Sequence, residues 1–540
     1  MGELILPRAA NGPNDEPKTA PANAQEIELK FELEPDALDR LEERLTVRAG
    51  AHKPKPAQTL VSTYYDTAGL ALQKARVTLR VREDGRRRIQ TLKTEGDGLF
   101  TRGEWEWPLA KGQALDLEAL KATPFAGLAA AHGEDLRPVF ATRMKRAKRL
   151  IREPAGEVEV ALDRGQIEAD GRTTGLCELE LELKAGKAEA LFGLARRLAE
   201  TEPLRLSFIT KAERGFKLLS NTPEGLAPVT APALDRHMSV AAAFGAIGAQ
   251  GLRQLAANAQ AFNLTRQPDA VHQTRVAIRR LRTAFKLFAP AVRDGEFGRI
   301  EDELKWLAGE LDQARDLDVM IVETFAPAAD RFQDQGGMTE LGERLQRTRA
   351  QAYERALKAV QGRRFLALTL DLAAWLDGGA WRDPDGPHYA ERAGAPVRAF
   401  AREGLDRLRR RIKRGGKDLH RLSPDQRHKL RISVKRLRYA QEFFGALFGE
   451  DARRRAFLAT LKDLQEVLGQ LNDLEVAREQ GLSLAETGGR AAGDTAREGA
   501  RQAFAAGLMI GVRARGEGAL LKRSIKLYDR FAKAEPFWRD

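Results

Sequence analysis

The sequence has little cysteine, few aromatic residues and no long apolar run. Its one cysteine, Cys177, excludes an internal disulfide framework and predicts a reducing, cytoplasmic location. No apolar stretch approaches the about 18 residues of a membrane span, so we expect no membrane partner. Residues 1–24 lack the basic region and apolar core of a signal peptide, and we interpret them as a flexible tail.

Acidic residues are outnumbered. Lysine and arginine total 90 against 77 aspartate and glutamate, which gives a formal net charge of +13 and predicts an anionic partner. The charge alone does not distinguish between nucleic acid, a membrane surface and polyphosphate as the anionic partner. Single-stranded nucleic acid is usually bound on aromatic platforms, and aromatics are only 6% of the chain, so nucleic acid is not the expected anion. The length of 540 residues predicts more than one domain.

Residues 26–33 alternate strictly between charged and apolar side chains, the pattern of a strand with two unlike faces. Glu26, Glu28 and Lys30 share the charged face. Neighbouring carboxylates repel one another unless a cation lies among them, and Mg²⁺ prefers oxygen ligands. Lys30 can bind phosphate oxygens. The stretch therefore indicates one half of a site that binds a metal ion and polyphosphate together. A solvated strand face explains the stretch alone equally well.

Further two-faced strands are predicted in the first half. Some are rich in acids (104–106 and 178–182, with 26–32), and others are rich in bases (76–82, 87–93 and 143–149). Residues 204–211 are a further strand candidate, and helices are expected near 36–45 and 188–200. If the sheet closes, every strand has an inner face. Charged inner faces would then line a tunnel that holds a triphosphate between metals and bases.

Six ordered motifs resemble the CYTH family, the triphosphate tunnel metalloenzymes. They are Glu26-x-Glu28-x-Lys30, Tyr64-Tyr65-Asp66-Thr67, Leu79-Arg80-Val81-Arg82, Leu92-Lys93-Thr94, Arg102-Gly103-Glu104-x-Glu106 and Glu178-x-Glu180-x-Glu182-x-Lys184. The resemblance covers residues 25–219. It implies an α+β domain with an eight-stranded antiparallel tunnel that cleaves or cyclises triphosphates with Mg²⁺ or Mn²⁺.

The resemblance also implies roles for individual residues. The expected metal ligands are the carboxylates Glu26, Glu28, Glu180 and Glu182. The expected phosphate-binding catalytic residues are Lys30, Arg80, Arg82, Lys93, Arg143 and Lys211. Asp163 is a further carboxylate candidate.

A proline-containing stretch without periodicity, residues 220–234, predicts a linker. Beyond it the pattern becomes helical and contains an internal repeat, in which residues 271–282 match 427–438 and His428 lies 156 positions after His272. We therefore expect an all-α domain over 235–535, built from two pseudo-symmetric bundles at about 235–375 and 390–535.

Each repeat carries a stripe of basic side chains on one helix. The stripes consist of His272, Arg275, Arg279, Arg282 and Lys286 in the first copy and of His428, Arg431, Lys435 and Arg438 in the second. No acidic residue occurs within 271–286 or 427–441. Like charges four residues apart destabilise a helix, so an unpaired stripe favours an external anion. A solvated basic face is the usual alternative for one helix, and the duplication argues against it.

This half resembles a CHAD domain, a conserved-histidine α-helical domain that often follows CYTH domains in bacteria. The resemblance implies inorganic polyphosphate binding by the two basic helices. Asp316 and Asp473 are candidates for orienting the arginines.

Together the two halves predict a bacterial inorganic triphosphatase joined to a polyphosphate-binding domain, in the cytoplasm or on polyphosphate granules. One alternative is a tunnel enzyme for a nucleoside or thiamine triphosphate. The other is a non-catalytic polyphosphate-binding or granule protein.

Overall fold

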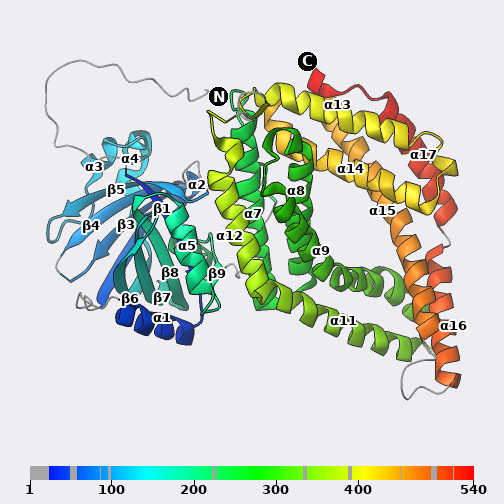
Figure 1. The fold of residues 1–540 in the computed structure, drawn as a ribbon, viewed down its shortest axis with the longest axis horizontal. Coiled ribbons are helices and arrows are strands. Elements are labelled where there is room, and N and C mark those ends of the chain that lie inside the picture. Colours follow the sequence, from blue (N-terminus) through cyan, green and yellow to red (C-terminus); the bar gives the residue numbers. More distant parts are fainter. Residues whose placement is uncertain are drawn as a thin grey trace.

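The computed structural model describes residues 24–540 apart from 49–56, 86, 95–98, 222–225, 228, 333–336, 387–391, 451, 488–495, 515 and 540. An antiparallel sheet with surrounding helices forms the N-terminal domain, and a largely helical domain follows it (Figure 1). This arrangement confirms the predicted fold class. All but the last residue of the expected flexible tail lies outside the described residues.

Nine strands form the sheet in the described part of the chain. They are β1 (Ala24–Glu32), β2 (Gln58–Asp66), β3 (Val77–Glu83), β4 (Arg88–Thr94), β5 (Thr101–Leu109), β6 (Arg137–Glu153), β7 (Gly156–Ala169), β8 (Arg172–Gly186) and β9 (Arg205–Leu206). Their order is β5-β4-β3-β2-β6-β7-β8-β1-β9, and β1 also pairs with β5. Eight strands were expected, and the additional strand is the two-residue β9, which pairs with β1.

The alternation in β1 separates an apolar face from a charged one. Leu29 and Phe31 are fully buried, and they belong to the same apolar core as residues of α1 (Pro35–Arg48) and α5 (Glu189–Ala199). The intervening charged residues point to the other face of the sheet. In the β1–β8 register Lys30 lies opposite Glu180 and Glu28 opposite Glu182.

The segment 204–211 differs from the predicted strand. Only Arg205–Leu206 is a strand, and Lys211 begins helix α6 (Lys211–Leu219). Thr210 caps this helix, because its hydroxyl accepts from the Glu213 amide while the Glu213 carboxylate accepts from the Thr210 amide. The remaining helices of this domain are α2 (Ala71–Lys74), α3 (Leu117–Lys121) and α4 (Ala126–His132).

The helical domain contains the two repeated basic stretches. Its helices are α7 (Val240–Thr265), α8 (Pro268–Val292), α9 (Phe297–Met320), α10 (Ala326–Arg331), α11 (Met338–Gln361), α12 (Arg363–Gly378), α13 (Val397–Gly415), α14 (Pro424–Phe444), α15 (Ala452–Thr487), α16 (Ala496–Ala514) and α17 (Glu517–Lys533). Helices α8 and α14, which carry the basic stripes, contact one another. Within the described segments, no helix combines the length and apolar character that a membrane span requires.

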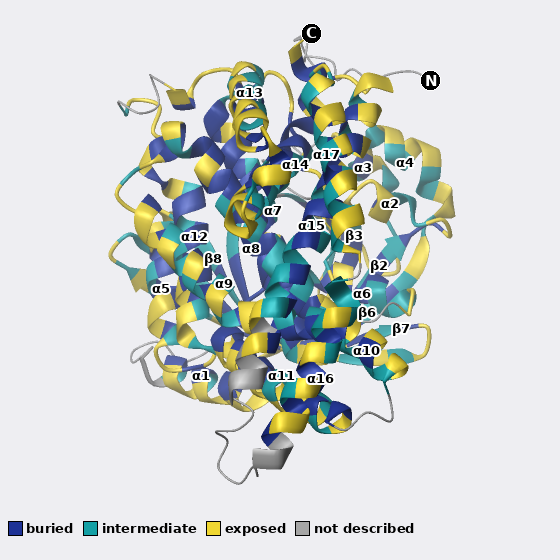
Figure 2. Cartoon of the chain, turned by 90° about the vertical axis from the view of Figure 1, so that its right-hand side faces the viewer, coloured by how far each residue is buried: buried dark blue, intermediate teal, exposed yellow. Residues whose placement is uncertain are grey.

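An aromatic cluster holds α7, α8 and α12 together. Phe244 packs edge-on against Trp375 and Trp381, and Phe285 packs against Phe244 and Trp375. In Figure 2 buried residues gather toward the interior of the molecule and exposed residues lie mainly along its periphery.

The two domains are joined by a packed interface. Helix α5 packs against α12, where the Asp371 carboxylate accepts from Arg196 of the sheet domain at 2.7 Å and from Arg299 of α9 at 2.6 Å. The connecting segment also lies along α7, because the Ala227 amide donates to Asn258 Oδ1 at 3.0 Å. Helix α7 is therefore held next to the sheet domain.

Candidate functional site

A cavity of about 500 Å³ lies on the charged face of the sheet. Its acidic wall comes mainly from β1, β7 and β8 and its basic wall from β3, β4, β6 and α6. The lining carboxylates include Glu28, Glu159, Glu180, Glu182, Glu104 and Glu106, and the lining cations include Lys30, Arg80, Arg82, Lys93, Arg146, Lys148, Lys184, Lys211 and Arg253. Eight of the ten residues predicted for this domain therefore line one cavity.

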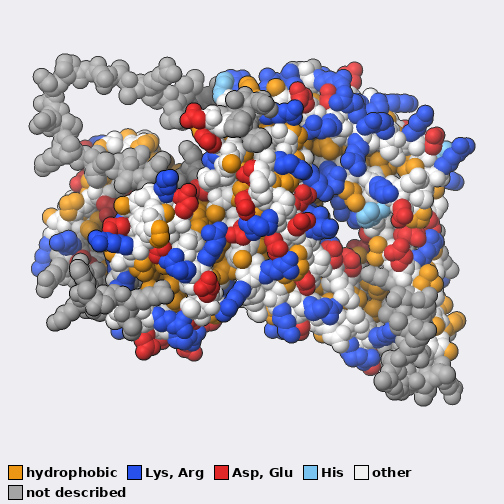
Figure 3. Space-filling view, in the orientation of Figure 1, with side chains coloured by type: hydrophobic (Ala, Val, Ile, Leu, Met, Phe, Trp, Pro, Cys, Tyr) orange, Lys and Arg blue, Asp and Glu red, His pale blue; other side chains and the backbone are white. Residues whose placement is uncertain are grey.

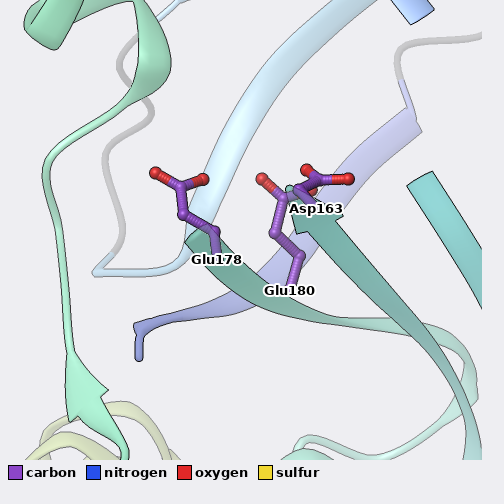
Figure 4. A group of neighbouring side chains, drawn as sticks. All are labelled: Asp163, Glu178 and Glu180. Carbon is purple, nitrogen blue, oxygen red and sulfur yellow. The ribbon is translucent and has the colours of Figure 1, made fainter. Parts of the chain in front are cut away.

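Asp163, Glu178 and Glu180 form an acidic cluster, of which Glu180 lines the cavity. They come from the adjacent strands β7 and β8, and their carboxylates extend to the same side of the sheet (Figure 4). The cluster has the composition of a metal site, since one oxygen of each residue lies within 4.8 Å of the others. Asp163 and Glu178 are fully buried.

Lys211 neutralises much of the acidic cluster. Its Nζ lies 2.5 Å from Glu178 Oε2, 2.7 Å from Glu180 Oε1 and 2.9 Å from Asp163 Oδ2. Burial alone would lower the pKa of Lys211, but the carboxylates outweigh it and raise this pKa above its usual value. A metal ion in the middle of the cluster would have to displace this ammonium group.

Arg146 compensates the same cluster from β6. Its guanidinium donates to Asp163 Oδ1 and to Glu180 Oε2, each at 2.6 Å. Burial would raise the pKa of the Glu180 carboxyl, but Lys211, Arg146 and Lys30 outweigh it and hold this pKa well below its usual value. The Glu180 carboxylate is therefore charged at neutral pH.

A second row of carboxylates crosses three strands of the same wall. Glu182 of β8 lies opposite Glu28 of β1 on one side and opposite Glu159 of β7 on the other. Lys148 contacts Glu159 at 2.7 Å, and Lys184 contacts Glu182. Like charges placed directly opposite destabilise a sheet, so this row also suits a divalent cation.

Glu26 belongs to the same strand, but its side chain lies outside the described residues. Its backbone pairs with Arg102 of β5. Its expected role as a metal ligand stays a prediction.

The basic wall carries closely spaced guanidinium groups. Arg80 lies 3.7 Å and Lys93 3.0 Å from the Glu104 carboxylate. The positive charge of Arg80, burial and Arg146 lower the pKa of Arg82 to about 10. Such crowding of like charges favours an anion in the cavity.

Arg143 differs from the expectation, because it lies on the opposite face of β6. Its side chain is exposed and pairs with Glu168 at 3.1 Å, whereas Met144, Arg146 and Lys148 line the cavity. A strand turns each successive side chain to the other face, so a one-residue difference decides the assignment.

The sequence interpretation also missed a buried link behind the acidic cluster. Arg214 of α6 contacts Glu32 and lies 4.0 Å from Glu178. Glu32 in turn accepts from Ser207 Oγ at 2.9 Å and from Gln260 Nε2 at 2.9 Å. Two signals could have indicated these residues: Glu178 shares the face of Glu180, and the Thr-x-x-Glu capping box at Thr210 marks the start of α6.

In the helical domain, α8 and α14 bring parts of the two basic stripes together. Arg279 Nε lies 3.5 Å from the Tyr439 hydroxyl across the two helices. Burial, Arg431 and Arg279 lower the pKa of Lys435 to about 7. The sequence-distant cations Arg279, Arg431 and Lys435 therefore share one region of positive charge.

Aspartates of α9 and α15 hold the arginines of this region. Arg275 Nη1 lies 2.7 Å from Asp312 Oδ1, and Arg431 Nη2 lies 3.8 Å from Asp473 Oδ1. Burial raises the pKa of Asp316, which Arg275 partly offsets. Figure 3 shows a hollow in the face of the helical domain, with Lys and Arg gathered along one side of it.

The two repeat histidines have different environments. Burial, Arg315 and Arg279 lower the pKa of His272 to about 4, so this ring is neutral at pH 7. His428 contacts Asn472 Oδ1 through Nδ1. His272 therefore adds no positive charge to its stripe at neutral pH, and its buried Nδ1 has no hydrogen-bond partner among the described residues.

The C-terminal ends of the two stripes, Lys286 on α8 and Arg438 on α14, have different surroundings. Burial and the positive charges of Arg436 and Arg282 lower the pKa of Lys286. The Nζ of Lys286 lies 4.0 Å from the Glu301 carboxylate. Arg438 instead lies 3.6 Å from Glu442 on its own helix.

Comparison with known families identifies both domains. The CYTH domain model matches residues 24–216 and the CHAD domain model matches residues 246–480. The chain therefore consists of a CYTH domain followed by a CHAD domain.

Three related proteins illustrate the similarity. The chain is 31% identical over 198 residues to an inorganic triphosphatase of Haemophilus influenzae, a match covering 36% of this chain and about half, 55%, of that relative. It is 26% identical over 520 residues to an uncharacterized protein of Mycobacterium tuberculosis, covering 88% of this chain and 91% of that protein. The crystal structure of the CHAD domain from the plant Ricinus communis is 29% identical, with a TM-score of 0.48, over 58% of this chain and 99% of that chain.

Proposed function

We propose that the N-terminal domain hydrolyses inorganic triphosphate with Mg²⁺ or Mn²⁺ and that the helical domain binds inorganic polyphosphate. The observation that carries the catalytic half is the cavity, where an acidic wall of β1, β7 and β8 faces a basic wall of β3 and β4. The 31% identity to an inorganic triphosphatase supports the choice of substrate.

The residues present fit a divalent metal. Glu28, Glu180 and Glu182 would hold it through oxygen atoms, and Glu26 is the further expected ligand. When bound, the metal supplies Lewis-acid polarisation of a phosphoryl oxygen. The donor set is compatible with either Mg²⁺ or Mn²⁺.

The protein's own cations bind and orient the phosphate chain. Lys30, Lys93 and Arg80 present ammonium and guanidinium groups to the cavity, where they can donate to phosphate oxygens. The same donors stabilise the charge that develops on the transferring phosphoryl group. The raised pKa of Lys211 keeps that residue cationic throughout the neutral range.

Polyphosphate binding by the helical domain rests on the region where α8 and α14 meet. Arg279, Arg431 and Lys435 come from two helices. Burial and the neighbouring positive charge lower the pKa of Arg431 and of Lys435, an effect that a bound polyanion would offset. Because exposed charges are screened by salt, we expect polyphosphate affinity to fall as ionic strength rises.

Phosphate release tests the catalytic half directly. The intact protein is incubated with Mg²⁺ or Mn²⁺ and with triphosphate, ATP or long-chain polyphosphate. We expect release from triphosphate, its loss in Glu180→Gln, and near-normal release in the control Glu168→Gln, whose carboxylate lies on the outer face of the sheet. Equal release from ATP would favour a nucleoside triphosphate as substrate. If no phosphate were released from any of the three substrates while polyphosphate still bound, only the binding function would remain.

A further inference from the structure

Helix α7 belongs to the helical domain but contacts the sheet domain. Its Gln260 donates to Glu32 of β1 at 2.9 Å, and the same carboxylate group contacts Arg214 of α6. Figure 1 shows α7 and α12 on the side of the helical domain that faces the sheet. These contacts fix the position of α7 relative to the cavity.

The sequence of α7 contains a single charged residue, Arg253, among 26 residues that are otherwise apolar, small or amide-bearing. That residue lines the cavity of the sheet domain, together with Lys30 and Lys211. Its Nη2 donates to the backbone carbonyl of Leu99 at 3.4 Å. The cavity wall is therefore completed by a cation from the other domain.

Arg253 is more exposed than the two deeply buried lysines of the cavity. Lys30 and Lys211 are 7% and 5% exposed, whereas Arg253 is exposed. A linear phosphate chain whose one end is held by the deep lysines would extend toward the opening. An exposed cation on the cavity lining, such as Arg253, would then be reached by a longer chain and not by a shorter one.

A guanidinium group is chemically suited to this position. It carries five N–H donors in a planar fork, so it can contact the Leu99 carbonyl and a phosphate oxygen at the same time.

We propose that Arg253 binds the outer part of the phosphate chain, so that the helical domain sets the chain-length preference of the cavity. This inference rests on the proposed function, because it takes a linear inorganic phosphate chain as the ligand. It assigns to the helical domain a direct contact with the substrate of the sheet domain.

The test compares Arg253→Ala, Arg253→Lys and the wild-type protein as full-length chains. The matched control is Arg266→Ala, which removes the arginine at the C-terminal end of the same helix, where it pairs with Glu354 at 2.8 Å. For triphosphate and tetraphosphate we measure KM and kcat, and for orthophosphate and pyrophosphate the inhibition constants. Thermal unfolding of each variant monitors the integrity of the interface.

We expect Arg253→Ala to raise KM for tetraphosphate about tenfold, the low end of what a hydrogen bond to a charged group contributes. The effect should be smaller for triphosphate and absent for orthophosphate, with kcat nearly unchanged, and Arg253→Lys should restore part of the affinity. Arg266→Ala should match the wild type.

An unchanged KM, or an equal loss for every chain length, would overturn the proposal and leave Arg253 as an interface contact. If the wild-type protein released no phosphate, the proposed function would fail instead. Calorimetric titration of triphosphate and tetraphosphate into the metal-free proteins would then still decide the role of Arg253, since equal Kd values in wild type and Arg253→Ala would refute it.

Discussion

Replacing Lys211 by methionine would leave the acidic cluster without its central cation. The substitution keeps most of the side-chain volume and removes the ammonium group that lies 2.5–2.9 Å from three carboxylate oxygens. Removing one partner of a buried ion pair costs about 3–5 kcal/mol. Since 1 kcal/mol shifts the melting temperature of a domain of this size by about 2–4 °C, we expect Tm of the sheet domain to fall by roughly 10 °C at pH 7.

The pKa shifts of these groups also predict how the melting temperature changes with pH. In the wild type, Asp163 and Glu180 have pKa values below the usual ones, so their contribution to stability is present above the ordinary carboxyl pKa and is lost as pH falls below it. Lys211 has a raised pKa, so its contribution is complete at every pH below the usual lysine value. Wild-type Tm should therefore be flat from pH 6 to 9. In Lys211→Met the repelling carboxylates take up protons in the folded state, and the deficit should shrink as pH falls toward 5.

Thermal unfolding followed by circular dichroism at pH 5, 7 and 9 measures this effect, with Lys145→Met as control because that lysine is exposed on the outer face of β6. Adding Mn²⁺ should restore Tm in Lys211→Met more than in the wild type, since the emptied cluster then offers a metal site and a ligand that binds only the folded state stabilises it. A loss of less than about 2 °C, with no pH dependence, would show that Lys211 is not the compensating cation.

Three further outcomes follow from the same structure. Arg146→Ala should lower triphosphate turnover at least about tenfold, because it removes charged hydrogen bonds, whereas Arg143→Ala on the outer face should stay within about twofold. Polyphosphate affinity measured by fluorescence titration should fall as pH rises from 6 to 8, because Lys435 loses its proton near pH 7, and Lys435→Arg should remove that dependence. Gly215→Ala should cost about 1–3 kcal/mol in thermal unfolding, because the added Cβ would lie 2.1 Å from the Phe140 ring; unchanged stability would show that α6 shifts freely.

The strict alternation of Glu26–Leu33 was sufficient to predict a strand with one charged and one buried face. It also predicted which of its residues would face the cavity, because the period of a strand leaves no other arrangement once Leu29 and Phe31 are buried. The acidic strand β8 follows the same rule. The sequence therefore predicted Glu28, Glu180 and Glu182 of the acidic wall, but neither Glu159 nor the buried Glu178 behind it.

The basic strand β6 shows where such reasoning stops. In the stretch 143–149 lysine and arginine occur at both odd and even positions, so the alternation cannot tell the inner face from the outer one. The register with β7, which places Arg146 opposite Asp163, decides it. That pairing is a long-range property of the sheet, and no local pattern encodes it. The contacts of Arg253 with the sheet domain are of the same kind.

The sequence repeat likewise implies more symmetry than the folded helices have. The position equivalent to Lys286 in the second copy is Glu442, which lies just beyond its acid-free stretch. Glu442 contacts Arg280 of α8, whereas Arg436, the equivalent of Arg280, contributes positive charge beside Lys286. One side of the α8–α14 contact is therefore neutralised and the other is cationic. If a polyanion binds across both helices, as proposed, it would meet unequal charge at its two ends, and the duplicated motif would then bind it in one preferred direction.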